Sequence, residues 1–119
     1  MSDRITIWHN PSCSASRHAL EAIRAAGHEP EIIRYLETGW IARELTDLLA
    51  EAGLTPAAAM RRKGDLVRDL GLLGPDVDDD TILRAMLEHP ALVERPFVRT
   101  PHGTVLARPI ERLTVLLGR

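Results

Sequence analysis

The first 37 residues of the chain contain the order strand, helix, strand, and this order limits the folds open to it. Residues 4–8 (RITIW) alternate as a short strand does, and Asn10-Pro11 then marks a turn. Apolar residues recur at helical spacing over 14–26, and residues 31–37 (EIIRYLE) form a second strand candidate. Because strands joined through a helix usually pair in parallel, this segment predicts a βαβ unit.

The rest of the chain indicates a helical middle, followed by two strands and a last helix. Helical patterns lie at residues 41–52, 55–62, 67–74 and 76–90. Residues 97–100 and 104–109 flank the turn PHG, which predicts a β-hairpin, and residues 110–119 form an apolar helix. We therefore expect an α/β fold with a central mixed four-stranded sheet, βαβ then ββα. It forms a single domain over residues 1–119, with a helical insertion at about 40–90.

Composition excludes several classes of partner. With 119 residues, the chain suffices for one domain around one core. The net charge is −2 and no apolar run reaches transmembrane length, so we expect no nucleic-acid and no membrane partner. A single cysteine excludes an intramolecular disulfide and a cysteine-rich zinc site, and it favours a reducing compartment, the cytoplasm. The acidic segment at 76–80 (DVDDD) lacks the glycine and distal glutamate of a calcium loop, so no metal site is predicted.

The one cysteine, Cys13, lies between the first strand and the helix that follows it. A thiol at a helix N-terminus has a lowered pKa, because unpaired backbone N–H groups and nearby cations stabilise the thiolate. His9 and Arg17 are close in sequence and are expected to add positive potential. This placement favours a nucleophilic role for Cys13, although a lone cysteine also occurs as a small buried apolar residue.

The sequence CSAS is not a CxxC motif, because Ser16 occupies its fourth position. No second thiol therefore lies one helical turn from Cys13. Redox chemistry at Cys13 then needs a thiol from another molecule, such as glutathione or a second protein. Ser16 can offer its hydroxyl to the sulfur, or it can serve as an ordinary serine of the first helical turn.

Three arginines are candidates for binding an anion. Arg61 ends the segment AAAMRRK, while Arg95 and Arg108 each precede a proline beside a predicted strand. A guanidinium presents a planar fork of donors that matches a tetrahedral oxyanion. Such a cluster beside a thiolate would hold an oxyanion and lower the pKa of the thiol. The alternative is three separate surface arginines, and the sequence alone does not show that they converge.

At its N-terminus, with ITIWHNPSCSASRHALEAIR, the chain resembles the glutaredoxin-linked arsenate reductases, a family of thioredoxin-like fold. The resemblance continues in collinear order through YLE (35–37), MRRK (60–63), LGL (70–72) and MLEHPALVERPFVRTPHGTVLARP (86–109). The last block is specific, because it fixes arginines, prolines and a glycine turn at set spacings. The resemblance therefore covers nearly the whole chain.

The resemblance implies a role for each matching residue. Cys13 matches the catalytic cysteine of the family, and Arg61, Arg95 and Arg108 match its three oxyanion-binding arginines. A slip of one position in the alignment would make Arg62 the ligand in place of Arg61.

Two further matches concern the surroundings of the thiol. His9 matches a histidine that supports the thiolate. The dipeptide Arg95-Pro96 matches one whose peptide bond is cis and lies beside the active-site thiol, so we expect a cis bond before Pro96.

The activity that the resemblance implies is reduction of arsenate to arsenite through a covalent adduct on Cys13. Glutathione serves as co-substrate and glutaredoxin as partner, with no bound cofactor, and we expect a monomer. Two alternatives stay open. One is a glutathione-dependent thiol reductase of the same fold that does not act on arsenate. The other is a regulator similar to the Spx proteins, which bind RNA polymerase, although many of those carry the CxxC motif that this chain lacks.

Overall fold

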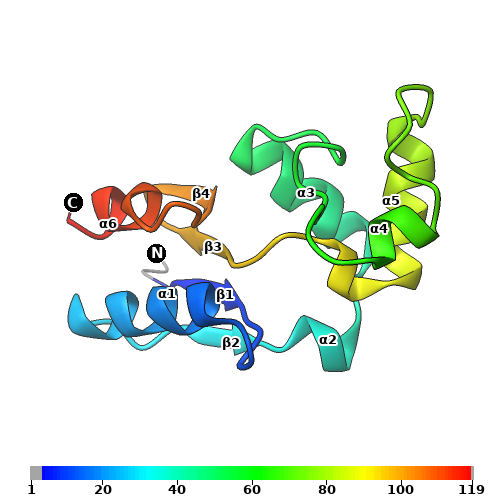
Figure 1. The fold of residues 1–119 in the computed structure, drawn as a ribbon. Coiled ribbons are helices and arrows are strands. Elements are labelled where there is room, and N and C mark those ends of the chain that lie inside the picture. The colour runs from blue at the N-terminus through cyan, green and yellow to red at the C-terminus, as the bar shows by residue number, and fades with distance from the viewer. Residues whose placement is uncertain (1–3, 119) are drawn as a thin grey trace. The chain divides into compact units, whose positions relative to one another are not determined.

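The computed structural model describes residues 4–118 and divides the chain into two compact units. Unit 1 holds the chain up to Thr38 and again from Arg95 onward, and unit 2 is Gly39–Glu94. Figure 1 traces this order by colour, with both ends of the chain in unit 1 and the green and yellow helices in unit 2. Among the described residues, no helix is long and apolar enough to cross a lipid bilayer.

Unit 1 contains a four-stranded sheet. Its strands are β1 (Thr6–Trp8), β2 (Glu31–Ile33), β3 (Phe97–Thr100) and β4 (Gly103–Leu106). They lie in the order β2-β1-β3-β4, and β1 runs parallel to β2 but antiparallel to β3, which pairs antiparallel with β4. The predicted mixed sheet, the βαβ unit and the C-terminal hairpin are therefore confirmed.

Two helices, α1 (Ser14–Ala25) and α6 (Glu111–Leu117), pack on one face of this sheet. On α1, Ala19 and Ile23 are fully buried at helical spacing, which gives the helix one apolar face. The shared core consists of Ile5, Ile7, Ala19, Ile23, Val98, Ala107 and Leu113. This core holds α1 and α6 together against the sheet.

The second strand is shorter than the sequence pattern predicts. The prediction of a strand over 31–37 is wrong beyond Ile33, where β2 ends and a helical turn, α2 (Tyr35–Thr38), begins. The last ladder bond runs from the His9 N–H to the Ile33 carbonyl, at 2.8 Å. After His9 the first strand turns away, so the chain beyond Ile33 has no neighbouring strand there and satisfies its backbone groups within a helical turn.

Unit 2 is helical, as the sequence predicts. It contains α3 (Ala42–Ala52), α4 (Leu66–Asp69), α5 (Asp79–Glu88) and the 3-10 turn η1 (Pro90–Leu92). Asp78 caps α5 by accepting a hydrogen bond from the Thr81 N–H at 2.8 Å, and the helix ends before Pro90. The predicted acidic start and proline stop of this helix are confirmed.

The predicted helix over 55–62 is wrong, because the structure has a turn over 56–59 followed by an extended segment. Thr55 does accept a hydrogen bond from the Ala58 N–H, at 3.1 Å, so the cap exists without a helix behind it. Met60 instead forms an antiparallel bridge with Val93. This pairing takes up the backbone groups on either side of Met60 that a longer helix would use.

Candidate active site

Cys13 is the residue that caps the N-terminus of α1, and its backbone is extended (φ −98°, ψ 123°). A tight turn delivers it there, because the Asn10 carbonyl accepts a hydrogen bond from the Cys13 N–H at 3.0 Å, and the Asn10 side chain accepts one from the Ser12 N–H. The Cys13 carbonyl then accepts the first bond of the helix from the Arg17 N–H. The predicted position of the thiol at the helix start is confirmed.

The surroundings lower the pKa of the Cys13 thiol to about 7, from an ordinary value of 9.0. Partial burial acts to raise this pKa, but hydrogen bonds to the sulfur outweigh it. The donors are the Ser16 N–H, the side chains of Arg95 and Arg108, and the Ala15 N–H. Near neutral pH the thiolate, which is the nucleophilic form, is therefore much more populated than in an ordinary cysteine.

Arg95 and Arg108 reach Cys13 from the two ends of the β3–β4 hairpin. The Arg108 Nη2 lies 3.6 Å from the Cys13 Sγ, and its Nε donates to the Arg95 carbonyl at 2.7 Å. Arg95 is buried, with 9% of its surface exposed. Both Arg-Pro peptide bonds, before Pro96 and before Pro109, are cis. Two of the three candidate arginines thus converge on the thiol, and the predicted cis bond before Pro96 is confirmed.

His9 lies behind the helix start and is buried. Its Nδ1 is 2.6 Å from the Ser16 hydroxyl oxygen, which also accepts a hydrogen bond from the Asn10 N–H at 3.0 Å. Burial, then the positive charges of Arg34, Arg24 and Arg17, lower the pKa of His9. The imidazole is therefore neutral at neutral pH, and the expectation that it adds positive potential is wrong.

Ser16 acts on the sulfur through its backbone rather than through its side chain. Of the two roles that the sequence left open for its hydroxyl, the contact with the sulfur is not the one described: the hydroxyl bonds to His9 and Asn10. The Ser16 N–H is the donor that lowers the pKa of Cys13. Arg17 is exposed and donates to the Pro11 carbonyl at 2.9 Å, so it ties the helix to the turn before Cys13.

Arg61 belongs to unit 2, where its backbone and side chain are both held. Its N–H donates to the Leu92 carbonyl at 2.7 Å, and its Nη1 lies 3.6 Å from the Glu94 Oε1, with both side chains about three-quarters buried. The neighbouring Arg62 is exposed and donates to the Ala57 carbonyl at 3.2 Å. The two adjacent arginines therefore differ in their partners.

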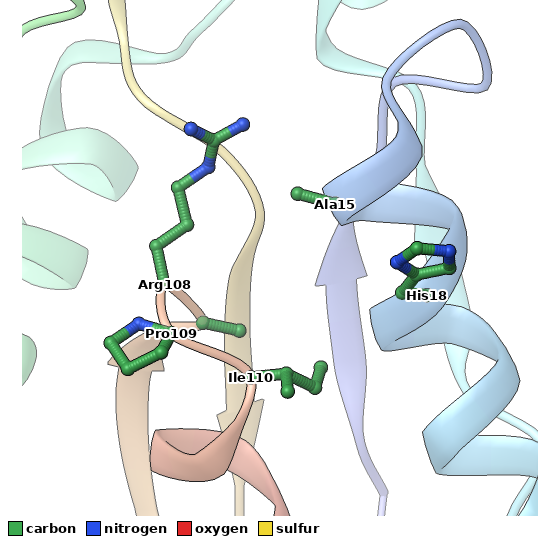
Figure 2. A pocket seen from close by; sticks show the side chains of 6 residues that line it. Ala15, His18, Arg108, Pro109 and Ile110 are labelled. Carbon is green, nitrogen blue, oxygen red and sulfur yellow. The ribbon is translucent and has the colours of Figure 1, made fainter.

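A pocket of about 390 Å³ opens beside Arg108 in unit 1 (Figure 2). Its lining consists of Ala15, His18, Ala107, Arg108, Pro109 and Ile110. The sequence gives little sign of His18 or of this pocket. The only indication is that two small residues, Ala15 and Ala107, lie on segments far apart in the chain. Within residues 4–118, no cluster of three or more His, Cys, Asp or Glu side chains is placed to hold a metal ion.

The fold and the site together define a class. The sheet is mixed, with the strand order β2-β1-β3-β4, and one cysteine with a lowered pKa lies at the start of the helix after β1. These features define a thioredoxin-like protein with a single-cysteine site. The chain belongs to the ArsC family, whose model matches residues 8–115.

Relatives of known name agree with this membership. The chain is 49% identical over 107 residues to the arsenate reductase of Rhizobium meliloti (strain 1021), covering 90% of this chain and 76% of that one. It is 45% identical over 113 residues to the arsenate reductase of Escherichia coli (strain K12), covering 95% and 80%. Its structure matches the arsenate reductase from Vibrio cholerae with a TM-score of 0.87 at 38% identity, over 94% of this chain and 96% of that one.

Proposed function

We propose that this protein is an arsenate reductase that converts arsenate to arsenite, with Cys13 as nucleophile and with glutathione and glutaredoxin supplying the electrons. The observation that carries the proposal is the Arg108 guanidinium 3.6 Å from the Cys13 sulfur, whose pKa is about 7. A thiolate beside fixed cations suits attack on a tetrahedral oxyanion. The choice of arsenate as the substrate is supported by relatives named arsenate reductases, which are 45–49% identical to this chain.

In the first step, arsenate docks over the N-terminus of α1, where backbone N–H groups favour an anion. The Cys13 thiolate attacks arsenic. An S–As bond forms, an As–OH bond breaks, and the hydroxide takes a proton from the solvent and leaves as water. Arsenic stays pentavalent in this thiol–arsenate adduct.

Glutathione and glutaredoxin then complete the reduction. The glutathione thiol attacks arsenic, a second As–OH group leaves as water with the proton of that thiol, and arsenic carries two sulfurs. A glutaredoxin thiolate attacks the glutathione sulfur and forms a mixed disulfide. The bond between arsenic and the glutathione sulfur breaks, and its electron pair stays on arsenic, which becomes trivalent. Water then replaces Cys13, arsenite leaves and the thiolate returns.

Within this scheme, Arg95 and Arg108 hold the oxygens of the oxyanion next to the sulfur they already contact. Arg61 is the third ligand, a role supported by the match of MRRK (60–63) to the family pattern. Arg61 is favoured over Arg62 because its guanidinium is anchored by Glu94. His9 is a positioning residue, which holds the first turn of α1 through Ser16.

The reaction takes place in the cytoplasm, where glutathione keeps a lone thiol such as Cys13 reduced. The protein works as a monomer, because Cys13, Arg95 and Arg108 all come from one unit of one chain. It carries no resident cofactor.

The test is oxidation of NADPH by purified protein with arsenate, glutathione, glutaredoxin and glutathione reductase, run beside the Cys13→Ser variant. Arsenate-dependent turnover that the variant loses is the expected result. A glutathione-dependent rate on disulfide substrates, with none on arsenate, would instead identify a thiol reductase. Retention of RNA polymerase by the protein in a pull-down, without either activity, would identify a regulator.

A further inference from the structure

The pocket beside Arg108 shares two residues with the thiolate site. Arg108 lines the pocket, and its Nη2 lies 3.6 Å from the Cys13 sulfur. Ala15 also lines the pocket, and its backbone N–H lowers the pKa of Cys13. Figure 2 shows Ala15 pointing from α1 toward Arg108, with Ile110 facing α1 from the start of α6. Cys13 itself does not line the pocket, but a molecule bound there would contact two residues that also contact the reacting sulfur.

The lining has one consistent chemistry. Ala15, Ala107, Pro109 and Ile110 provide small apolar walls, and His18 and Arg108 provide nitrogen donors. Of the described residues that line the pocket, none is acidic. A small molecule with two anionic groups complements the two donors, and its uncharged part can lie along the small apolar walls.

The volume of the pocket further limits which molecules can bind in it. At about 390 Å³, the pocket lies at the lower end of the range of roughly 300–1,000 Å³ that is usual for small-molecule sites. A small peptide-like thiol suits this volume better than an inserted segment of a protein. Because Cys13 is the chain's single cysteine, a thiol must in any case come from another molecule.

We propose that this pocket is the glutathione site, with His18 as the residue that positions the co-substrate. This inference rests on the proposed function, which requires glutathione to approach the adduct on Cys13. Glutathione carries one thiol, two carboxylates and one ammonium group, so it is a net anion near neutral pH. Arg108 is the donor on the side of Cys13, and the exposed imidazole of His18 donates to a carboxylate farther along α1.

The bound tripeptide then presents its thiol to the adduct. Its sulfur attacks arsenic, the new As–S bond replaces an As–OH bond, and the hydroxyl leaves as water with the proton of the thiol. Holding the thiol beside the adduct turns an encounter between two molecules into a step within one complex. His18 takes no part in the bond changes and acts only through the position of glutathione.

The kinetic test uses variants of His18, which lies on the exposed side of α1 where alanine favours the helix. In His18→Ala, the KM for glutathione rises about three- to tenfold, as expected for the loss of one solvent-exposed hydrogen bond of ordinary strength, while the KM for arsenate and kcat at saturating glutathione stay unchanged. His18→Lys restores the lower KM and His18→Glu raises it further. His28→Ala, at an exposed histidine beyond the end of α1, is the matched control.

A binding test separates this inference from the proposed function. S-methylglutathione cannot attack arsenic, so its binding to ¹⁵N-labelled protein is independent of turnover. The expected result is saturable shifts of the backbone signals of Ala15, His18, Ala107 and Ile110, weakened in His18→Ala. Shifts confined to other residues, or an unchanged KM for glutathione in both His18→Ala and His18→Glu, would overturn the inference. Shifts of these signals by glutaredoxin but not by S-methylglutathione would also overturn it, in favour of a protein-docking surface.

Discussion

The candidate oxyanion-binding arginines of the two units differ in what their guanidinium groups contact. In unit 1, Arg95 and Arg108 direct their guanidinium groups at the Cys13 sulfur. In unit 2, the guanidinium of Arg61 lies 3.6 Å from a carboxylate, that of Glu94. Glu94 and Arg95 are neighbours in sequence, yet one ends unit 2 and the other begins the second part of unit 1.

This difference separates two tasks of a cation in an oxyanion enzyme. A guanidinium that already contacts the thiol stabilises the thiolate before any substrate arrives, so its loss changes the free protein. A guanidinium paired with a carboxylate is held in a fixed orientation but does not contact the thiol. Removing it therefore changes mainly the affinity for the anion and leaves the pKa of the thiol in the free protein unchanged. The following changes test this comparison.

Cys13→Ser has the largest expected effect. Because a serine hydroxyl is not ionised near neutral pH, arsenate-dependent NADPH oxidation falls to the rate without protein. The far-ultraviolet circular dichroism spectrum stays the same, since serine is a favoured N-cap residue whose hydroxyl oxygen can accept from the Ala15 and Ser16 N–H groups in place of the sulfur. Appreciable turnover by this variant would remove the nucleophile from the scheme.

Arg108→Gln is expected to change the free protein. Loss of a cation beside the sulfur raises the pKa of Cys13 from about 7 toward its ordinary value of 9.0. The measurement is the rate of iodoacetamide alkylation against pH, whose midpoint lies near 7 in the unaltered protein and moves upward in the variant. We also expect kcat/KM for arsenate to fall at least about tenfold. An unmoved alkylation midpoint would contradict the assigned contact.

The same pKa makes stability depend on pH. The folded pKa of Cys13 is lower than the unfolded one, so the thiolate stabilises the folded state above pH 9, and this contribution is lost as the pH falls through about 7. In Cys13→Ser this part of the pH dependence disappears. Urea unfolding of both proteins between pH 6 and 10 measures the difference.

Arg61→Gln is expected to act on the substrate-bound protein, with a smaller effect. The KM for arsenate rises about tenfold because one charged ligand is lost, with a much smaller change in kcat. The adjacent Arg62→Gln is the matched control, since Arg62 is exposed and bonds only to a backbone carbonyl of its own segment in the contacts described. A larger effect from Arg62 than from Arg61 would reassign the ligand.

Ser16→Ala has the smallest expected effect on activity, because the Ser16 N–H that contacts the sulfur remains. Its cost is in stability. The buried His9 and the Asn10 N–H lose their partner, which lowers the free energy of unfolding by about 1–3 kcal/mol. Ser14→Ala, at an exposed position of the same helical turn, is the control. Equal stability of the two variants in urea unfolding would show that the His9–Ser16 bond adds little.

Local signals predicted most of the fold, and they failed where the hydrogen bonding of the backbone depended on a segment distant in sequence. The alternation at 4–8, the helix after Cys13 and the proline stop of α5 are each encoded within a few residues, and the structure has them. The strand over 31–37 was cut short because β1 offers no partner beyond His9. The helix over 55–62 was replaced by a turn because Met60 pairs with Val93.

The site divides in the same manner. The sequence by itself determined that Cys13 caps a helix, because a cap depends on the turn before it and on the first helical residues, all adjacent in the chain. It did not determine that His9 is neutral, since that follows from burial. Nor did it determine which arginines meet the sulfur. Only the tertiary structure decided this, because the order of strands in the sheet brings Arg95 and Arg108 back to a cysteine more than eighty residues earlier in the chain.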